Sequence, residues 1–293
     1  MRINPTNRLE RGRPVRLSDG RQRHFLFTGA QPALPIYVES IGYNPEQESI
    51  DREEGYPCFH WLETVSGEGI VEVAGQRLTL PPHTGILLYP HIKHSYRKAS
   101  DEWSTSYITF DGSQAAPMVT SLGFRHSEWF KWEQEASELS GHLTRMLVAI
   151  ETADDRSGLD ASSGLYRFLL LLKKYGQVSS GSSLFQHMER LNPLLAWLDS
   201  NYSDPAVGLP EMADQLNVSA RYLNMLFRKA FGMTAYTYLI QLRLSKAKEL
   251  ISGLERKPIM QIAQEVGYRD ASHFISVFRK AEGMTPEQFR KLH

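Results

Sequence analysis

Four residues near the C-terminal end of the chain have side-chain types and spacing that suit contact with the edges of DNA bases. They follow the i, i+3, i+4, i+7 pattern of one helix face: Arg221, Asn224, Met225 and Arg228. An arginine can bond the O6 and N7 atoms of guanine, an asparagine can bond the N6 and N7 atoms of adenine, and a methionine can contact the methyl group of thymine. The same residues would also suit an ordinary solvated helix face, so their meaning depends on the element that carries them.

That element is one of two copies of a single unit. Residues 209–234 and 259–285 correspond at an offset of 50 before a turn and 51 after it. Each copy predicts a short helix with a small alanine, Ala213 or Ala263, then a tight turn and a second helix, which is the pattern of a helix-turn-helix. A tandem pair favours a protein that contacts two adjacent segments of DNA.

Capping residues and apolar spacing support this interpretation. Ser219 and Asp270 are predicted to be the N-caps of the second helices, and Gly232 and Gly283 are predicted to end them. The apolar residues of each second helix fall on one face: Leu223, Leu226, Phe227 and Ala230 in the first copy, and Phe274, Val277, Phe278 and Ala281 in the second.

The outward face of the second copy is different. It carries Ser272, Ile275, Ser276 and Arg279, with His273 beside them. Because this face is poor in long hydrogen-bond donors, the first copy is predicted to carry more of the sequence discrimination, with Arg279 as a phosphate contact. The predicted DNA-binding residues are Arg221, Asn224, Met225, Arg228, Ser272, His273, Ser276 and Arg279.

Over residues 190–293 the chain resembles the DNA-binding domain of the AraC/XylS family of bacterial transcription regulators. The resemblance rests on one long ordered pattern: Ala213, Ser219-x3-Leu223-x2-Leu226-Phe227-Arg228, Gly232, Arg243-Leu244-x2-Ala247-x2-Leu250, Ile262-Ala263-x2-Val266-Gly267-Tyr268 and His273-Phe274-x3-Phe278-Arg279-Lys280-x2-Gly283-Met284-Thr285-Pro286. It implies that two recognition helices enter successive major-groove segments of a double-stranded DNA operator, and that RNA polymerase is a partner if the protein is an activator. The linking helix, predicted from Tyr236 to Ser252, would be roughly 25 Å long, which suits groove segments about one helical turn apart.

Residues 24–112 have the pattern of short β-strands separated by glycine and proline turns. Apolar or alternating runs occur at 25–27, 36–41, 59–65, 70–74, 78–80, 86–89 and 107–110. With a predicted turn at Ser66–Gly69, this spacing indicates a sandwich or a barrel. The order of Gly-x-Gly turn, strand, proline-rich turn and His94 resembles the cupin-like effector domain that precedes the DNA-binding half in the same family.

A small barrel of this kind can hold one ligand. Candidate lining residues combine aromatic surface with hydrogen-bonding edges: Arg52, Tyr56, His60, Trp61, His94, Tyr96, Trp103, Thr105 and Tyr107. Each could equally belong to ordinary barrel packing. The family resemblance places Arg52, Tyr96, Thr105 and Tyr107 near the sugar-contacting positions of the arabinose-responsive regulator, where Thr105 replaces a histidine and Tyr107 a tryptophan. These departures argue against arabinose itself, and the resemblance implies another sugar or related small molecule as effector and carbohydrate uptake or catabolism genes as targets.

Two other classes of protein would use the same segments. A cupin-type metal-dependent enzyme, either an isomerase or a dioxygenase, would need a His-x-His motif followed by a glutamate; that motif is absent, and His83, His91 and His94 have no carboxylate at matching spacing. A DNA-repair or architectural protein would need a nucleophilic cysteine in a suitable motif, and Cys58 has none. We therefore expect no enzymatic activity, no catalytic residue, no metal and no cofactor.

Residues 128–175 are predicted to be helical. They carry two apolar stripes: Leu139, Leu143, Met146, Leu147 and Ile150, then Leu165, Phe168, Leu169 and Leu172. Such helices could cover the open face of the barrel or, as the family resemblance implies, form the interface of a homodimer.

The predicted architecture is a two-domain α+β chain. A cupin-like β-barrel with two packing or dimerisation helices comes first, and an all-α domain with two helix-turn-helix units joined by a linking helix follows. The predicted boundaries are an N-terminal arm at 1–23, an effector-binding and dimerisation domain at 24–178, a linker at 179–188 and a DNA-binding domain at 189–293.

Charge and composition fit this organisation. Residues 184–293 hold 14 Lys and Arg against 11 Asp and Glu, a net charge of +3, and residues 1–183 hold 19 against 22, a net charge of −3. A charge of +3 is only mildly basic, so nonspecific affinity for DNA should be modest. The single cysteine excludes an internal disulfide, and the sequence shows neither a signal peptide nor a membrane span. We therefore expect a cytoplasmic protein that does not associate with membranes.

Overall fold

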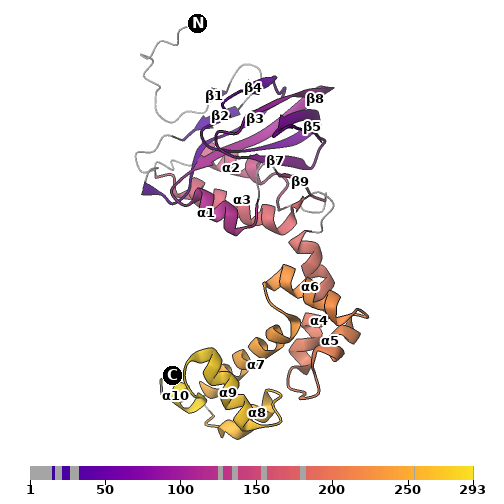
Figure 1. The fold of residues 1–293 in the computed structure, drawn as a ribbon. Coiled ribbons are helices and arrows are strands. Elements are labelled where there is room, and N and C mark those ends of the chain that lie inside the picture. Colours follow the sequence, from indigo (N-terminus) through magenta and orange to yellow (C-terminus); the bar gives the residue numbers. More distant parts are fainter. Residues whose placement is uncertain are drawn as a thin grey trace. The chain divides into compact units, whose positions relative to one another are not determined.

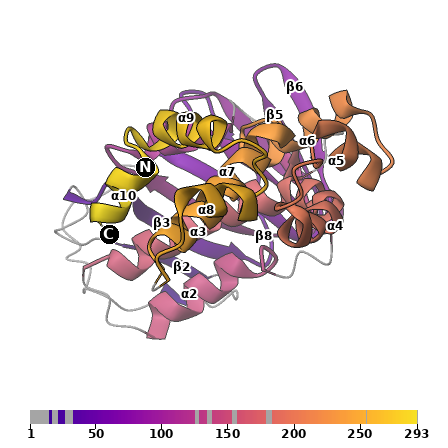
Figure 2. The same ribbon diagram turned by 90° about the horizontal axis from the view of Figure 1, so that it is seen from below.

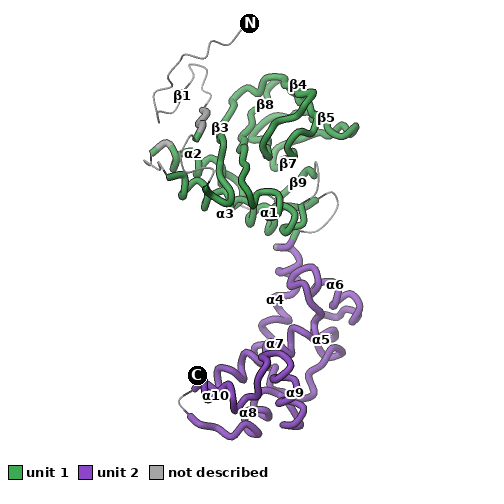
Figure 3. Tube along the Cα trace, turned by 60° about the vertical axis from the view of Figure 1, so that its left-hand side comes forward, with its two compact units in different colours: residues 1–183 green, residues 184–293 purple. Residues whose placement is uncertain are grey.

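The computed structural model describes residues 15–16, 22–26, 33–124, 128–133, 138–152, 157–178, 183–253 and 255–292. The chain divides into two compact units, residues 1–183 and residues 184–293 (Figure 3). In the described residues, the first unit combines a β-sheet with helices and the second is helical throughout (Figure 1). This two-domain α+β architecture is the one that the sequence predicts.

The first unit is built on an antiparallel sheet. Its described strands are β1 (Val15–Arg16), β2 (Gln22–Phe25), β3 (Tyr37–Asn44), β4 (Ile50–Arg52), β5 (Phe59–Val73), β6 (Gln76–Leu80), β7 (Thr84–Leu88), β8 (His94–Asp111), β9 (Trp129–Lys131) and β10 (Gln177–Val178). They are ordered β1-β2-β3-β8-β5-β7-β9-β10, with β4 added to β8 and β6 added to β5. The long strands β5 and β8 pair along both of their halves. Residues from both halves share one buried cluster, so the sheet folds over and encloses its inner face.

Two apolar clusters lie on opposite faces of this sheet. The inner cluster consists of Leu62, Val71, Val73, Leu80, Ile86, Leu88, Tyr96, Trp103 and Tyr107. The outer cluster lies between the other face and the helices α1 (Ala115–Ser121), α2 (His142–Thr152) and α3 (Leu159–Tyr175), which lie along the sheet (Figure 1). Most residues of the two predicted apolar stripes are buried in the outer cluster. The stripes therefore cover the sheet, which was one of the two roles open for them.

Two segments of the first unit differ from the prediction. The predicted turn at Ser66–Gly69 is a bulge within the continuous strand β5, where the pairing register with β8 shifts. Gly67 has a φ of +71°, and the Trp103 ring packs so closely on Gly69 that a side chain there would collide with it. The two glycines thus permit the bulge. Residues 129–131, predicted to be helical, form β9 because they pair with the edge of β7.

The second unit contains the two predicted helix-turn-helix units. Its described helices are α4 (Leu184–Asn201), α5 (Leu209–Gln215), α6 (Ala220–Phe231), α7 (Ala235–Ile251), α8 (Ile259–Glu265), α9 (Ala271–Glu282) and α10 (Pro286–Leu292). The pairs α5–α6 and α8–α9 are the two units, and the linking helix α7 lies between them (Figure 2). It has 17 residues and begins one residue earlier than predicted.

The predicted caps of α6 and α9 are confirmed. The side chains of Ser219 and Asp270 accept hydrogen bonds from first-turn backbone N–H groups at 3.2 and 2.9 Å. Gly232 and Gly283 end the helices at φ values of +72° and +75°, in the left-handed region that favours glycine. Five residues of the predicted apolar faces are buried: Leu223, Leu226, Phe227, Phe274 and Phe278. Ala230 and Val277 are half-buried, and Ala281 is exposed.

The predicted linker and the predicted N-terminal arm differ in how much of each the structure describes. The linker predicted at 179–188 is shorter, because α4 begins at Leu184 and packs into the same core as α6. Residues 179–182 lie outside the described residues. So does the predicted arm 1–23, apart from residues 15–16 and 22–23, which belong to β1 and β2. In the part of the chain that the structure describes, no helix has the length and apolar character to cross a membrane.

Candidate nucleic-acid interface and effector site

Helix α6 presents a polar face opposite its buried side. Arg221, Met225 and Arg228 lie exposed on that face, as predicted. Neither arginine forms an ion pair with any residue that the structure describes, whereas Lys246 and Lys248 elsewhere in the unit pair with glutamates. An exposed guanidinium without an internal partner is available to bases or phosphates.

Asn224 has a role that the sequence did not indicate. Its Oδ1 atom accepts a hydrogen bond of 3.0 Å from the backbone N–H of Ala235, the first residue of α7. A bidentate contact with adenine would need the same oxygen. This bond holds α6 against the start of α7. An amide oxygen can accept a second hydrogen bond, so the adenine contact stays a prediction.

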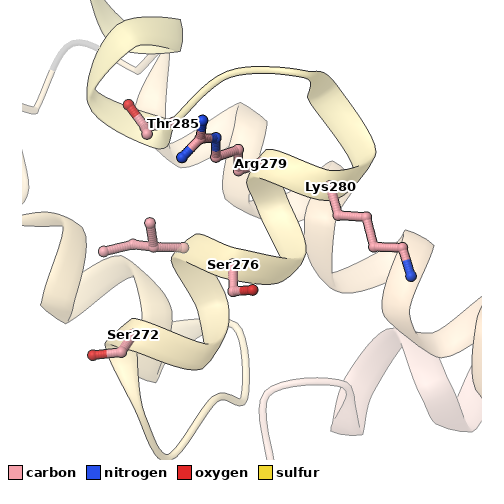
Figure 4. Close-up of a pocket in the computed structure, with 6 residues that line it drawn as sticks. Ser272, Ser276, Arg279, Lys280 and Thr285 are labelled. Carbon is pink, nitrogen blue, oxygen red and sulfur yellow. The ribbon is translucent and has the colours of Figure 1, made fainter.

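Helix α9 presents a second exposed face. It carries Ser272, Ser276 and Arg279, and His273 beside them contacts the ring of Tyr268 at 5.6 Å between centroids. A hollow of about 680 Å³ adjoins this face, lined by Ser272, Ile275, Ser276, Arg279, Lys280 and Thr285. In Figure 4 the Arg279 side chain lies on the Thr285 side of α9, and Lys280 extends away on the other side.

In the first unit, five of the nine predicted ligand-binding residues come together as a group of buried rings. The His60 ring lies 6.3 Å from His94 and Tyr96 and 6.0 Å from Tyr107, measured between centroids. Trp103 lies 6.1 Å from Tyr96 and is perpendicular to it. These rings come from β5 and β8, whose register places His60 and Tyr107 on the inner face.

Arg52 and Tyr56 extend this group. The guanidinium carbon of Arg52 lies 4.4 Å from the centre of the Tyr56 ring, and its Nη1 atom lies 3.4 Å from Nδ1 of His60. The Tyr56 hydroxyl donates to Glu39 at 3.0 Å. Burial and the Glu39 carboxylate raise the pKa of Tyr56, so the hydroxyl keeps its proton.

The neighbours of the two histidines determine which ring nitrogen carries a proton. Nδ1 of His94 lies 2.7 Å from the carbonyl oxygen of Ile92 and must donate to it. Burial lowers the pKa of His94, and the positive charge of Arg52 acts in the same direction, so the ring is neutral. Its Nε2 is therefore an acceptor, and it is buried without a hydrogen-bond partner in the described residues. At His60, Arg52 can only donate, which makes Nδ1 the acceptor and leaves the proton on Nε2.

Two predicted residues already use their polar atoms within the protein. The hydroxyl of Thr105 donates to Gln47 at 2.6 Å, and Nε1 of Trp103 donates to Thr64 at 3.0 Å. Gln47 and Glu39 were not predicted from the sequence. Only Glu39 left a signal, a carboxylate within a segment that predicts a β-strand.

Trp61 does not join the ring group. It lies on the opposite face of β5, fully buried in the outer cluster, where its ring contacts Phe130 and Phe168. Its Nε1 donates to Glu63 at 3.0 Å. The prediction that Trp61 lines the barrel interior is corrected by the alternation of side chains along a strand, because its neighbour His60 occupies the inner face.

Of the residues considered for metal or cysteine chemistry, His94 belongs to this ring group. The described residues contain no cluster of three His, Cys, Asp or Glu side chains able to hold a metal ion. Burial raises the pKa of the Cys58 thiol to about 11, with Glu39 and Asp111 adding to the effect, so the thiol is protonated and weakly nucleophilic.

The second unit contains two helix-turn-helix units, and the first unit encloses a group of polar aromatic rings. This combination defines a DNA-binding protein that has a separate domain for binding a small molecule. Residues 36–169 match the family described as AraC-like ligand binding domain, and residues 212–292 match a helix-turn-helix domain family. The chain belongs to the AraC family and is a DNA-binding transcription regulator with a ligand-binding domain.

Individual proteins show how far the likeness extends. The HTH-type transcriptional activator RhaS of Escherichia coli is 27% identical over 272 residues, which cover 88% of this chain and 94% of RhaS. The C-terminal domain of the two-component response regulator yesN from Fusobacterium nucleatum is 31% identical, and the match covers 35% of this chain and 98% of that domain with a TM-score of 0.34. ToxT from Vibrio cholerae is 15% identical, with 88% and 97% of the two chains covered and a TM-score of 0.33.

Proposed function

We propose that this regulator responds to a neutral sugar, acts as a homodimer on a double-stranded operator and controls genes of carbohydrate uptake or catabolism. The likeness to RhaS, an activator by name, supports activation through contact with RNA polymerase. The effector class rests on the chemistry of the ring group in the first unit.

The observation that carries the effector proposal is the buried acceptor of His94. A ligand that satisfies Nε2 of His94 must present a donor, which a hydroxyl does and a carboxylate does not. The flat ring of Tyr96 stacks on the His94 ring at 6.1 Å between centroids, and the ring of Tyr107 lies 6.0 Å from His60. Such rings suit the C–H faces of a sugar. Together these groups favour an uncharged polyhydroxylated compound.

Replacing His94 with phenylalanine is expected to weaken sugar binding by roughly 5- to 150-fold, because a hydrogen bond at a buried site is lost while the ring is retained. Calorimetry on the full chain would compare neutral pentoses, hexoses and 6-deoxyhexoses with the corresponding sugar acids. His91→Asn is the matched control, since His91 is exposed and has a φ of +61°, which asparagine tolerates.

The results of these binding experiments test the ligand class separately from the effect of the ligand on operator binding. Binding of acids alone, or equal sugar affinity in the parent protein and His94→Phe, contradicts the neutral-sugar proposal. If a sugar binds but leaves operator affinity and transcription unchanged, the ligand class holds and the regulatory switch is wrong, because a ligand shifts only states that it binds unequally.

The homodimer proposal rests on a stripe along the outer face of α3. It consists of Leu159, Tyr166 and Leu170, which are 59%, 45% and 42% exposed and lie seven and then four residues apart. By contrast Leu143 and Met146, which belong to one of the two predicted stripes, are buried in the outer cluster. A second copy of α3, packed against this one, would cover the exposed stripe.

Replacing both Tyr166 and Leu170 with glutamate is expected to raise the dimer dissociation constant at least about tenfold, because charges would replace apolar surface at the interface. Sedimentation velocity on the full chain would measure it. Val65→Glu changes an equally exposed apolar residue, 46% exposed on β5, and should leave the assembly intact. An unaltered dimer in the double variant would place the interface elsewhere.

A further inference from the structure

Among the positions at which the two helix-turn-helix copies differ, one difference has a structural reason. Asn224 of the first copy bonds the N–H of Ala235. At the offset of 51, the second copy has Ile275 in place of Asn224 and Pro286 in place of Ala235. A proline has no N–H to be satisfied, so position 275 is free of the tethering role that position 224 performs.

Ile275 also has no role in the core of the second unit. Its side chain is 37% exposed, and it does not belong to the buried cluster formed by α7, α8 and α9. It lines the hollow beside α9 together with Ser272, Ser276 and Arg279. A β-branched residue at this helix position therefore contributes little to the stability of the fold.

The surroundings of Ile275 match one chemical group in the DNA major groove. The short side chains of Ser272 and Ser276 stand on either side of it in the helix and allow close approach. Arg279, one turn further along α9, has no ion pair with the described residues and is available for a phosphate. The C5 methyl group of thymine is the apolar group that base edges present in this groove.

We propose that Ile275 contacts a thymine methyl group and thereby sets the sequence preference of the second helix-turn-helix unit. The proposal rests on sequence-specific DNA binding by this protein, with α9 as the recognition helix of that unit. The outward face of α9 has few long hydrogen-bond donors, and for that reason the sequence predicted it to discriminate weakly between bases. The proposal gives this face a role in base discrimination through an apolar contact.

The test uses the full chain and duplexes that it selects from a random DNA library. Each thymine of the selected duplex is replaced in turn by deoxyuridine, which removes only the methyl group, and affinity is measured by fluorescence anisotropy at fixed salt. The parent protein should lose about fourfold in affinity at one thymine or more, the value of burying one methyl group. Ile275→Ala should bind the thymine and deoxyuridine duplexes equally at one of those positions.

Two matched variants identify the contact. Ile275→Val keeps the branched carbon and should keep most of the discrimination. Met225→Ala, in the first helix-turn-helix unit, should leave the discrimination at that base position unaffected. If Ile275→Ala retains the parent's thymine preference at every position, the inference is overturned while DNA recognition stands. If the parent protein selects no common sequence, the DNA recognition on which the inference depends fails as well.

Discussion

Replacing Arg243 with methionine is expected to lower the free energy of unfolding of the helical unit by about 3 kcal/mol, since each carbonyl left without a donor costs about 1–3 kcal/mol. Arg243 lies on α7 and is 4% exposed. Its Nε and Nη2 atoms donate to the carbonyl oxygens of Tyr202 and Asp204, both at 2.8 Å. Nη2 also lies 3.4 Å from the carbonyl oxygen of Val207. Methionine keeps much of the volume but supplies no donor.

The same arginine lies at the junction of the two helix-turn-helix units. Its guanidinium carbon is 5.8 Å from the centre of the Tyr268 ring, in the turn of the second helix-turn-helix unit. Next to that ring, Gly267 has a φ of +86°, and a Cβ there would lie 2.6 Å from the carbonyl oxygen of Tyr202. Gly267→Ala should therefore destabilise the same junction by a separate route, through collision and backbone strain.

Calorimetric unfolding of the full chain would measure the loss, and hydrogen exchange would locate it in residues 184–293. Arg256→Ala removes an exposed arginine of the same unit and should change stability by no more than about 0.5 kcal/mol. A loss equal to that of the control, or one that appears equally in the β-domain, would contradict the role given to Arg243. Operator affinity should fall in parallel, because α6 and α9 bind through a common framework.

The helical unit could be predicted closely because its determinants are local. N-caps such as Ser219, C-terminal glycines such as Gly232 and the i, i+3, i+4 spacing of apolar residues all act within one or two turns. The tether of Asn224 was missed for the opposite reason. Its partner, Ala235, is eleven residues away on another helix, and no local pattern connects the two.

The β-domain was harder to predict because both faces of its central strand are buried. Residues 59–64 of β5 are all buried, so the polarity of the sequence does not alternate and cannot show which side chains face inward. His60 and Trp61 were therefore grouped together although they lie on opposite faces. Gln47 comes from a loop and meets Thr105 only through long-range pairing, so its position in sequence gave no indication of its place in the site.

A buried carboxyl group on the outer face of β5 is expected to make the stability of the β-domain depend on pH. Glu63 is 6% exposed, and burial raises the pKa of its carboxyl to about 7, although the hydrogen bond from Trp61 Nε1 acts in the opposite direction. In the unfolded chain the pKa is near its ordinary value of 4.5. The folded protein therefore binds this proton more tightly than the unfolded chain does. Its stabilising contribution is complete below about pH 4.5 and is lost as the pH rises through about 7.

Glu63→Gln should abolish this part of the pH dependence, since the amide is neutral throughout and its oxygen can still accept from Trp61. Relative to the parent protein, the variant should gain about 3 kcal/mol in free energy of unfolding between pH 4.5 and pH 8. Denaturant unfolding of both proteins at several pH values would measure this difference in free energy of unfolding. The contributions of the other titrating groups cancel because both proteins share them. Glu72→Gln, at an exposed position on the same strand with a 3.8 Å ion pair to Arg97, should show little change because exposed pairs contribute little. A stability difference between Glu63→Gln and the parent that stays constant with pH would mean that Glu63 is ionised in the folded protein, with a cation or water supplying the missing stabilisation.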